Sequence, residues 1–126
     1  MKAGGAGFDR SLRLLTPTEF KQVFQQSERC SDRHFTILYR PNALSRPRLG
    51  MAIAKKNLKR AVDRNLVKRL VREEFRLNRS GLSGFDLVVL CKRNLPINNR
   101  ALLKGSLERL IGKLMATQPK TLPDLS

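Results

Sequence analysis

Cysteine, histidine and long apolar runs are all scarce in this sequence of 126 residues. The two cysteines, Cys30 and Cys91, lie far apart and lack the spacing of zinc ligands, which predicts reduced thiols rather than a disulfide framework or a metal site. The single histidine, His34, has no partner pattern for acid–base catalysis and is expected at the surface or on an edge strand. No apolar run reaches the roughly 18 residues of a membrane-spanning helix. We therefore expect a cytoplasmic protein with no metal site of its own, no organic cofactor and no membrane contact.

Acidic residues are also few, with 10 Asp or Glu against 26 Lys or Arg and a formal net charge of +16. Such a surplus repels itself in the compact state and favours a polyanionic partner. The chain is 40% hydrophobic, which is enough for a folded core, and its length fits one domain. We expect flexible ends at 1–11 and 117–126 around a single domain at 12–116.

Cap signals and hydrophobic periodicity predict the order of the elements. Thr16, Pro17 and Glu19 have the pattern of a capping box and predict a helix that ends near Gln26. The other expected elements are strands over 33–39, 49–54 and 85–91 and helices over 61–78 and from about 98. The order α-β-β-α-β-α predicts an α+β fold, a two-layer sandwich of helices on a sheet.

The segment 55–79 concentrates the positive charge, with ten Lys or Arg against three acids. At about 100° per residue, every basic residue from Arg64 onward falls on one arc of the predicted helix, while Leu66, Leu70 and Leu77 fall on another. No acid lies on the basic arc, so ion pairs within the helix do not account for the charge. Arginine also makes planar, two-point contacts to phosphate. The arc predicts a nucleic-acid surface, and single-stranded or folded RNA suits it better than base reading in duplex DNA.

Four segments resemble the bacterial ribonuclease P protein family, in that family's order. RNLVKRLVREEFR at 64–76, preceded by AKKN at 54–57, is similar to its signature helix. The others are LRLLTPTEFKQVFQQ at 12–26, which resembles the first helix, RLGMAIAKKN at 48–57, which resembles the second strand and its turn, and NNRALL at 98–103, which resembles the start of the last helix. The resemblance implies a fold like the second domain of ribosomal protein S5, with a left-handed βαβ crossover that the general handedness rule does not predict.

The resemblance also implies a function. In this family the protein joins a large catalytic RNA, and the pair removes the 5′ leader from precursor tRNA. The chain is therefore expected to be the accessory subunit of a ribonucleoprotein endoribonuclease, with the catalytic centre and its Mg²⁺ held by the RNA. Its expected partners are that RNA and precursor tRNA, with no obligate protein partner.

Roles for individual residues follow from the same resemblance. The expected RNA-binding residues are the cations of the basic segment and one amide, namely Lys55, Lys56, Arg60, Arg64, Asn65, Lys68, Arg69, Arg72 and Arg76. A leader-binding cleft between the first helix and the sheet is expected to contain Phe20, Phe24 and one of Phe35 or Tyr39, which share a strand face. Leu66 departs from the family, which usually has Arg directly after the Arg-Asn pair. Because Leu66 lies away from the basic arc, we expect the main contact surface to be intact.

Two other functions fit the charge and the basic helix: a structural RNA-binding protein of ribosomal or RNA-chaperone type, and a DNA-compacting protein. A nuclease site on the protein itself is disfavoured. Glu73, Glu74 and Asp86 are candidate metal-binding carboxylates, but two-metal sites need several convergent acids and only ten exist in the chain. We therefore expect no catalytic residue on the protein.

Overall fold

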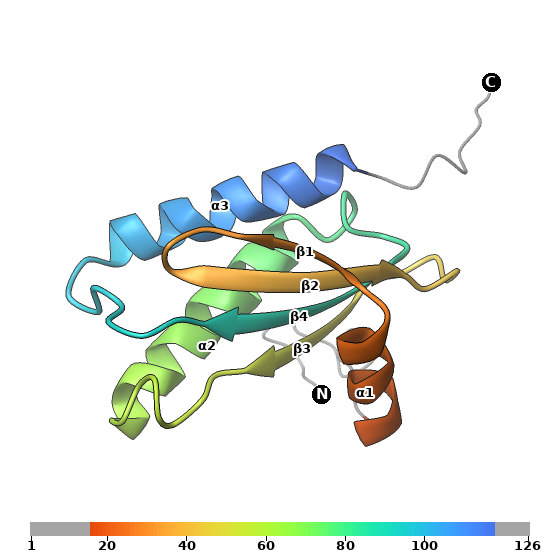
Figure 1. Ribbon diagram of the computed structural model, residues 1–126. Coiled ribbons are helices and arrows are strands. Elements are labelled where there is room, and N and C mark those ends of the chain that lie inside the picture. The colour runs from red at the N-terminus through yellow and green to blue at the C-terminus, as the bar shows by residue number, and fades with distance from the viewer. Residues whose placement is uncertain (1–15, 118–126) are drawn as a thin grey trace, which may run out of the picture.

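A computed structural model describes residues 16–117, and the expectations for 1–11 and 118–126 lie outside this range. The elements are, in order, α1(Pro17–Gln25), β1(Glu28–Ser31), β2(Phe35–Pro41), β3(Arg48–Ala52), α2(Ala61–Leu77), β4(Phe85–Cys91) and α3(Arg100–Ala116). The predicted α+β class is confirmed, and each predicted helix and strand is present within a few residues of its expected bounds (Figure 1).

The four strands form one mixed sheet in the order β1-β2-β4-β3. The pairs β1–β2 and β2–β4 are antiparallel, whereas β3 and β4 are parallel and joined through α2. In Figure 1 both parallel strands run from right to left, β4 lies above β3 and α2 lies behind the sheet, so this crossover is left-handed. The implied crossover is therefore present, against the usual preference.

Strand β1 is an element that the sequence analysis did not predict. Its sequence, ERCS, is mostly exposed and carries no apolar alternation. A turn at Asp32 joins it to β2, where the Asp32 carboxylate accepts hydrogen bonds from the amides of His34 and Phe35 at 2.8 and 2.9 Å. The turn explains why β2 begins at Phe35 rather than at residue 33.

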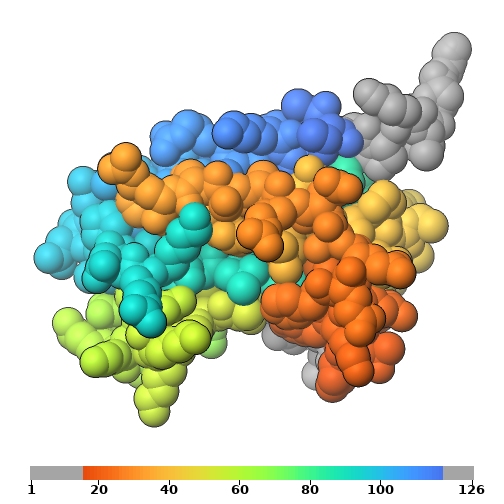
Figure 2. Space-filling view, viewed as in Figure 1, coloured from red at the N-terminus to blue at the C-terminus, as the bar shows by residue number. Residues whose placement is uncertain are grey.

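The main core lies between one face of the sheet and the pair α2 and α3. In Figure 1 α2 lies behind the sheet and α3 runs along its upper edge, above β1. Helix α3 faces this core with a stripe of five residues, Leu103, Leu107, Leu110, Ile111 and Leu114, which are all buried. Helix α1 packs on the opposite face through a smaller cluster of Val23, Leu38 and Val88. The larger part of that opposite face stays open beside α1 (Figure 2).

Candidate nucleic-acid interface

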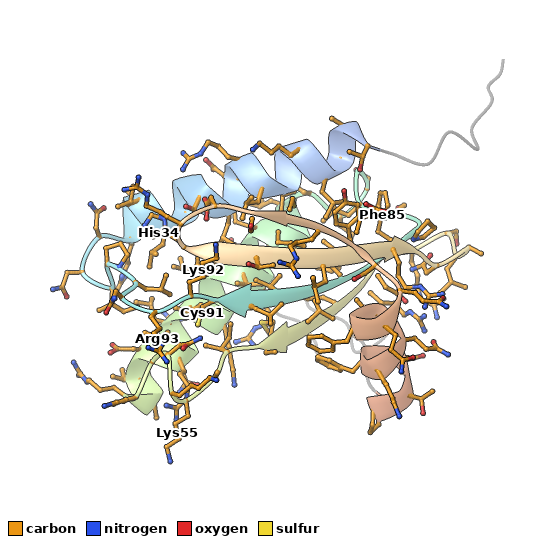
Figure 3. The ribbon with its side chains drawn as sticks, in the orientation of Figure 1. His34, Lys55, Phe85, Cys91, Lys92 and Arg93 are labelled. Carbon is orange, nitrogen blue, oxygen red and sulfur yellow. The ribbon has the colours of Figure 1, made fainter. Side chains whose placement is uncertain are left out.

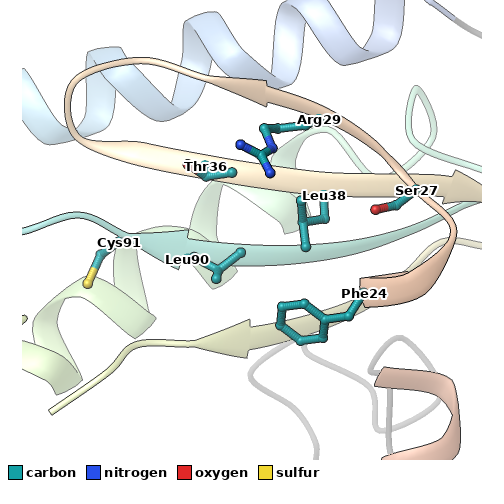
Figure 4. A pocket seen from close by; sticks show the side chains of 7 residues that line it. All are labelled: Phe24, Ser27, Arg29, Thr36, Leu38, Leu90 and Cys91. Carbon is teal, nitrogen blue, oxygen red and sulfur yellow. The ribbon is translucent and has the colours of Figure 1, made fainter. Parts of the chain in front are cut away.

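A groove lies between α1 and the open face of the sheet. It has a volume of about 410 Å³ and is lined by Phe24, Ser27, Arg29, Thr36, Leu38, Leu90 and Cys91 (Figure 4). Apart from Cys91, which ends β4 and belongs to the main core, the pleat explains the strand residues of this lining, because alternate residues point to the same face of a strand. Leu38 on β2 and Leu90 on β4 point towards α1, and both belong to its packing cluster. We call this cavity the α1 groove.

Two of the aromatic residues expected in the leader cleft lie on the other side of the sheet. Phe35 is fully buried in the main core, and Tyr39 packs on that core with its ring edge-on to Phe85 at a centroid distance of 5.7 Å. The prediction that one of them lines the cleft is wrong. The predicted sharing of a face by Phe35 and Tyr39 is correct, but that face meets α2 and α3. Thr36 and Leu38, on the other face of β2, take their place in the α1 groove.

The two phenylalanines of α1 have different environments. Phe20 is partly buried against the small α1 cluster, whereas Phe24 is 49% exposed and lines the groove. Their rings stack with a centroid distance of 6.3 Å and an interplanar angle of 23°. Phe20 therefore supports Phe24, and Phe24 presents an aromatic face to the groove.

The cations of α2 occupy its solvent side and one flank. Val67, Val71 and Phe75 are buried against the core. Asn65, Arg69 and Arg76 are exposed, while Arg64, Lys68 and Arg72 are half-buried. Glu74 of α2 pairs with Lys104 of α3 at 3.0 Å, so the flank that carries Lys68 and Arg72 lies on the side of α2 away from α3.

Two details of α2 differ from the sequence analysis. Leu77, which the helical wheel placed on the apolar side, is 57% exposed, and Leu66 is half-buried. The buried side is centred on Val67 and Val71, so these leucines lie at its border. In addition, Arg76 pairs with Glu73 at 2.7 Å, which offsets one positive charge of the arc.

Arg64 holds the loop before α2 in place. One of its guanidinium nitrogens, Nη1, donates to the carbonyl oxygens of Leu58 and Lys59 at 2.8 and 2.9 Å. Helix α2 begins after Arg60, which makes no side-chain cap hydrogen bond. The contact from Arg64 thus fixes the loop that carries Lys55 and Lys56, both of which are exposed.

The fold adds two cations that the sequence analysis missed, Lys92 and Arg93. They follow β4, and because β3 and β4 are parallel they lie at the same edge of the sheet as Lys55 and Lys56 (Figure 3). The side-chain amide of Asn57 donates to the carbonyl of Cys91 at 2.9 Å and ties the two loops together. The sequence does show two basic residues directly after a predicted buried strand. Their position beside Lys55 and Lys56 could not be predicted without the β3–β4 pairing.

The cations from both loops and from α2 form one surface, which we call the cationic surface. Its members are Lys55, Lys56, Arg60, Arg64, Asn65, Lys68, Arg69, Arg72, Arg76, Lys92 and Arg93. All are exposed or half-buried. In Figure 2 α1 and the segment that carries residues 55–65 project from the lower side of the molecule, with the sheet face recessed between them. The two loops, which carry Lys55, Lys56, Lys92 and Arg93, are the part of the cationic surface that lies at the edge of the open face, whereas α2 lies behind the sheet.

The carboxylates considered for a metal site are all in ion pairs. Glu74 is 2% exposed and bound to Lys104, and this hydrogen bond raises the pKa of Lys104. Asp86 is bound to Arg48, whose pKa is raised chiefly by that hydrogen bond. Across residues 16–117, no group of three or more His, Cys, Asp or Glu side chains is placed to hold a metal ion.

His34 is neither at the surface nor on an edge strand, the two places expected from the sequence, since it is only 8% exposed and lies in the turn between β1 and β2. Its Nδ1 lies 2.8 Å from the hydroxyl of the fully buried Ser106, which donates to Asp32 at 2.6 Å. These contacts join the β1–β2 turn to α3. His34 is therefore a structural residue, tied to a partner 72 positions away in sequence.

Comparison with known proteins identifies the family. A family model described as Ribonuclease P matches residues 8–115. A ribonuclease P protein component from Photorhabdus laumondii is 52% identical over 108 residues, which cover 85% of this chain and 87% of the relative. The chain belongs to the ribonuclease P protein family. It is thus the protein component of a ribonucleoprotein ribonuclease and has an RNA partner.

Other members of the ribonuclease P protein family agree with this assignment. The protein component from Escherichia coli is 49% identical over 104 residues, 82% of this chain and 87% of the relative. The ribonuclease P protein from Thermotoga maritima is 29% identical and matches with a TM-score of 0.70 over 85% of this chain and 98% of that one. The structure of a mutant of the Staphylococcus aureus RNase P protein, at 24% identity and a TM-score of 0.76 over 83% of this chain and 89% of that one, supports the fold. None of the three helices within residues 16–117 is long and apolar enough to cross a membrane.

Proposed function

We propose that this ribonuclease P protein binds the catalytic RNA through its cationic surface and the 5′ leader of precursor tRNA in its α1 groove. The observation that carries the proposal is that the two loops of the cationic surface lie at the edge of the sheet face that contains the α1 groove. These loops carry four cations, Lys55, Lys56, Lys92 and Arg93, and the groove offers one exposed aromatic ring, Phe24. Phosphate contacts would supply most of the affinity, and stacking on Phe24 would hold a leader base.

Besides its cationic side chains, the start of α2 has a second property that favours the binding of a phosphate group. The N-terminus of a helix carries a partial positive charge from its aligned peptide dipoles and its free amides. Here it lies beside the exposed Lys55, Lys56 and Arg60. A phosphate group of RNA at this end would meet the side-chain charge and the helix dipole together.

The groove combines features that suit a single strand rather than a duplex. Leu38 and Leu90 form an apolar floor, Phe24 a stacking wall, and Arg29 brings a cation to the same cavity. Figure 4 shows the Arg29 side chain extending across β2 towards this floor. A base could stack on Phe24 while its phosphate meets Arg29, which fits an unpaired leader.

The hydrolysis of the leader–tRNA bond is assigned to the RNA subunit, together with its Mg²⁺. This is supported by the use of Glu73, Glu74 and Asp86 in ion pairs within the protein. The role of the protein is to bind and orient. We place the enzyme in the cytoplasm and infer no obligate protein partner.

The test uses the purified chain, its catalytic RNA and a precursor tRNA at low and at physiological salt, with Mg²⁺ kept low. We expect leader removal to be faster with the protein than without it. Equal rates with and without the protein would contradict the proposal. An unrelated small basic protein at the same net charge serves as the control, because it supplies cations without the groove.

A further inference from the structure

Arg48, the first residue of β3, joins α1 to the sheet through three hydrogen bonds. Its Nε and Nη2 donate to the two carboxylate oxygens of Asp86, each at 2.9 Å, and its Nη1 donates to Glu19 Oε2 at 2.6 Å. Asp86 also accepts from the side-chain amide of Asn42 at 2.9 Å. The side chains of Glu19, Arg48 and Asp86 are 27%, 21% and 6% exposed, so the contacts lie largely away from solvent.

Glu19 has two tasks, one for each of its oxygens. Oε1 accepts from the amide of Thr16 at 3.4 Å and completes the capping box that starts α1. Oε2 accepts from Arg48. The residue that defines the start of the helix is therefore also the residue that binds the helix to β3 and β4.

Helix α1 has little else to fix its position. It spans nine residues, and Val23 is its only fully buried side chain among the described residues. A helix this short is marginal without tertiary contacts. The apolar contacts of Val23 and the partly buried Phe20 form one fixed point, and the Glu19–Arg48 contact provides a second point. Together the two points define the direction of α1 over the sheet, and with it the position of Phe24.

We propose that the chain of contacts Glu19–Arg48–Asp86 positions α1 and thereby determines how much better the enzyme binds leader-bearing than leaderless tRNA. The proposal rests on the α1 groove being the leader site. Glu19 and Arg48 act as positioning residues, because they hold the helix that carries Phe24 and do not line the groove. The bidentate pairing with Asp86 fixes the plane of the guanidinium so that Nη1 points at α1.

The experiment compares Glu19→Gln with Arg48→Met in the protein assembled with its catalytic RNA. Glu19→Gln raises the net charge by one and Arg48→Met lowers it by one. If the substitutions acted on RNA binding only through net charge, one would strengthen binding and the other would weaken it. Gln at the third helical position retains a capping-box partner, which protects the helix itself. Glu108→Gln, an exposed acid of α3, is the control for the charge change.

The measured quantity is the ratio of the dissociation constants for mature and leader-bearing tRNA. We expect both variants to lower this ratio, by roughly threefold to tenfold for loss of one charge-assisted contact, and Glu108→Gln to leave it unchanged. The double variant should lose little more than Arg48→Met alone, because the contact that Glu19→Gln weakens is already absent in Arg48→Met. Opposite effects of Glu19→Gln and Arg48→Met, or an unchanged ratio in Glu19→Gln, would overturn the proposal.

Amide hydrogen exchange separates this proposal from the assignment of the groove. In Glu19→Gln the amides of α1 should exchange faster while those of β4 and α3 keep their rates. If α1 does not exchange faster, the contact does not hold the helix and the proposal fails. If the unmodified enzyme shows no preference for leader-bearing tRNA, the leader assignment fails instead, and exchange still decides whether Glu19 holds α1.

Discussion

At the scale of single residues, the sequence predicted which cations share one side of α2, but it did not predict which aromatic side chains are buried. The basic arc of α2 followed from helical spacing, and its residues are exposed or half-buried as an RNA surface requires. Spacing along the sequence did not show that Phe35 is buried in the core while Phe24 is exposed in the groove. β2 carries large apolar residues on both faces, so alternation alone does not say which face meets the core.

Phe24 is the residue whose removal should affect leader binding most directly. Phe24→Ala removes the exposed ring of the groove and should weaken binding of leader-bearing tRNA by about 1–3 kcal/mol, the usual worth of one stacked base. Binding of mature tRNA should be unaffected. The measurement is equilibrium binding of both tRNAs to the assembled enzyme, with Leu102→Ala on α3 as an exposed apolar control. Equal weakening of both tRNAs would contradict a leader contact.

Arg72 tests the cationic surface. If it contacts one phosphate, Arg72→Ala should reduce the slope of log affinity against log salt by about 0.7 to 0.9, the contribution of one phosphate contact. The measurement is binding of the catalytic RNA between low and physiological salt. Arg109→Ala, an exposed arginine of α3 outside the cationic surface, should leave the slope nearly unchanged. A slope unaffected by Arg72→Ala would remove this residue from the interface.

At the scale of elements, a helix or strand was predicted where its own sequence has a capping box or a clear apolar pattern, and was missed where it has neither. The capping box of α1 is formed by the predicted residues, and β4 has its predicted bounds. β1 could not be predicted because a short, polar edge strand is held by backbone hydrogen bonds to β2 and has no hydrophobic pattern of its own. The Arg48 contacts join residues 29 and 38 positions apart, which local patterns do not reveal.

The turn between β1 and β2 provides a pH-dependent contribution to stability. Burial raises the pKa of Asp32, but hydrogen bonds from Ser106 and from the amides of Phe35 and His34 outweigh it, and the pKa is lowered. Because the pKa of Asp32 is lower in the folded than in the unfolded protein, its carboxylate stabilises the fold. This stabilisation is fully present above the unfolded-state pKa of about 4 and is lost as the pH falls through the folded-state pKa. Below pH 4 the wild type should therefore lose this contribution.

Urea unfolding at pH 6 and pH 3 checks this expectation. Asp32→Asn should unfold more easily than the wild type at pH 6, and the difference between the two proteins should shrink at pH 3. Glu108→Gln, which changes an exposed carboxyl of α3, should follow the wild type at both values. A constant difference between wild type and Asp32→Asn would show that the carboxylate charge of Asp32 is not what stabilises the turn.

At the scale of the whole molecule, the two faces of the sheet have different roles. One face meets α2 and α3 and forms the core, while the other is left open beside the short helix α1. The parallel pairing of β3 with β4 brings Lys92 and Arg93 to the loop that leads into α2. The positive charge of these two loops thus lies at the edge of the face that contains the groove. Sequence similarity supplied the family, but this adjacency depends on sheet order and required the structure.

The most direct test of the two-surface account is site-specific crosslinking in the assembled enzyme with precursor tRNA bound. A photoreactive phenylalanine analogue would replace Phe24 in one variant and Arg72 in another. The account predicts that position 24 crosslinks to leader nucleotides of the precursor tRNA and position 72 to the catalytic RNA. Crosslinks from position 24 to the catalytic RNA alone, or from position 72 to the leader, would contradict it.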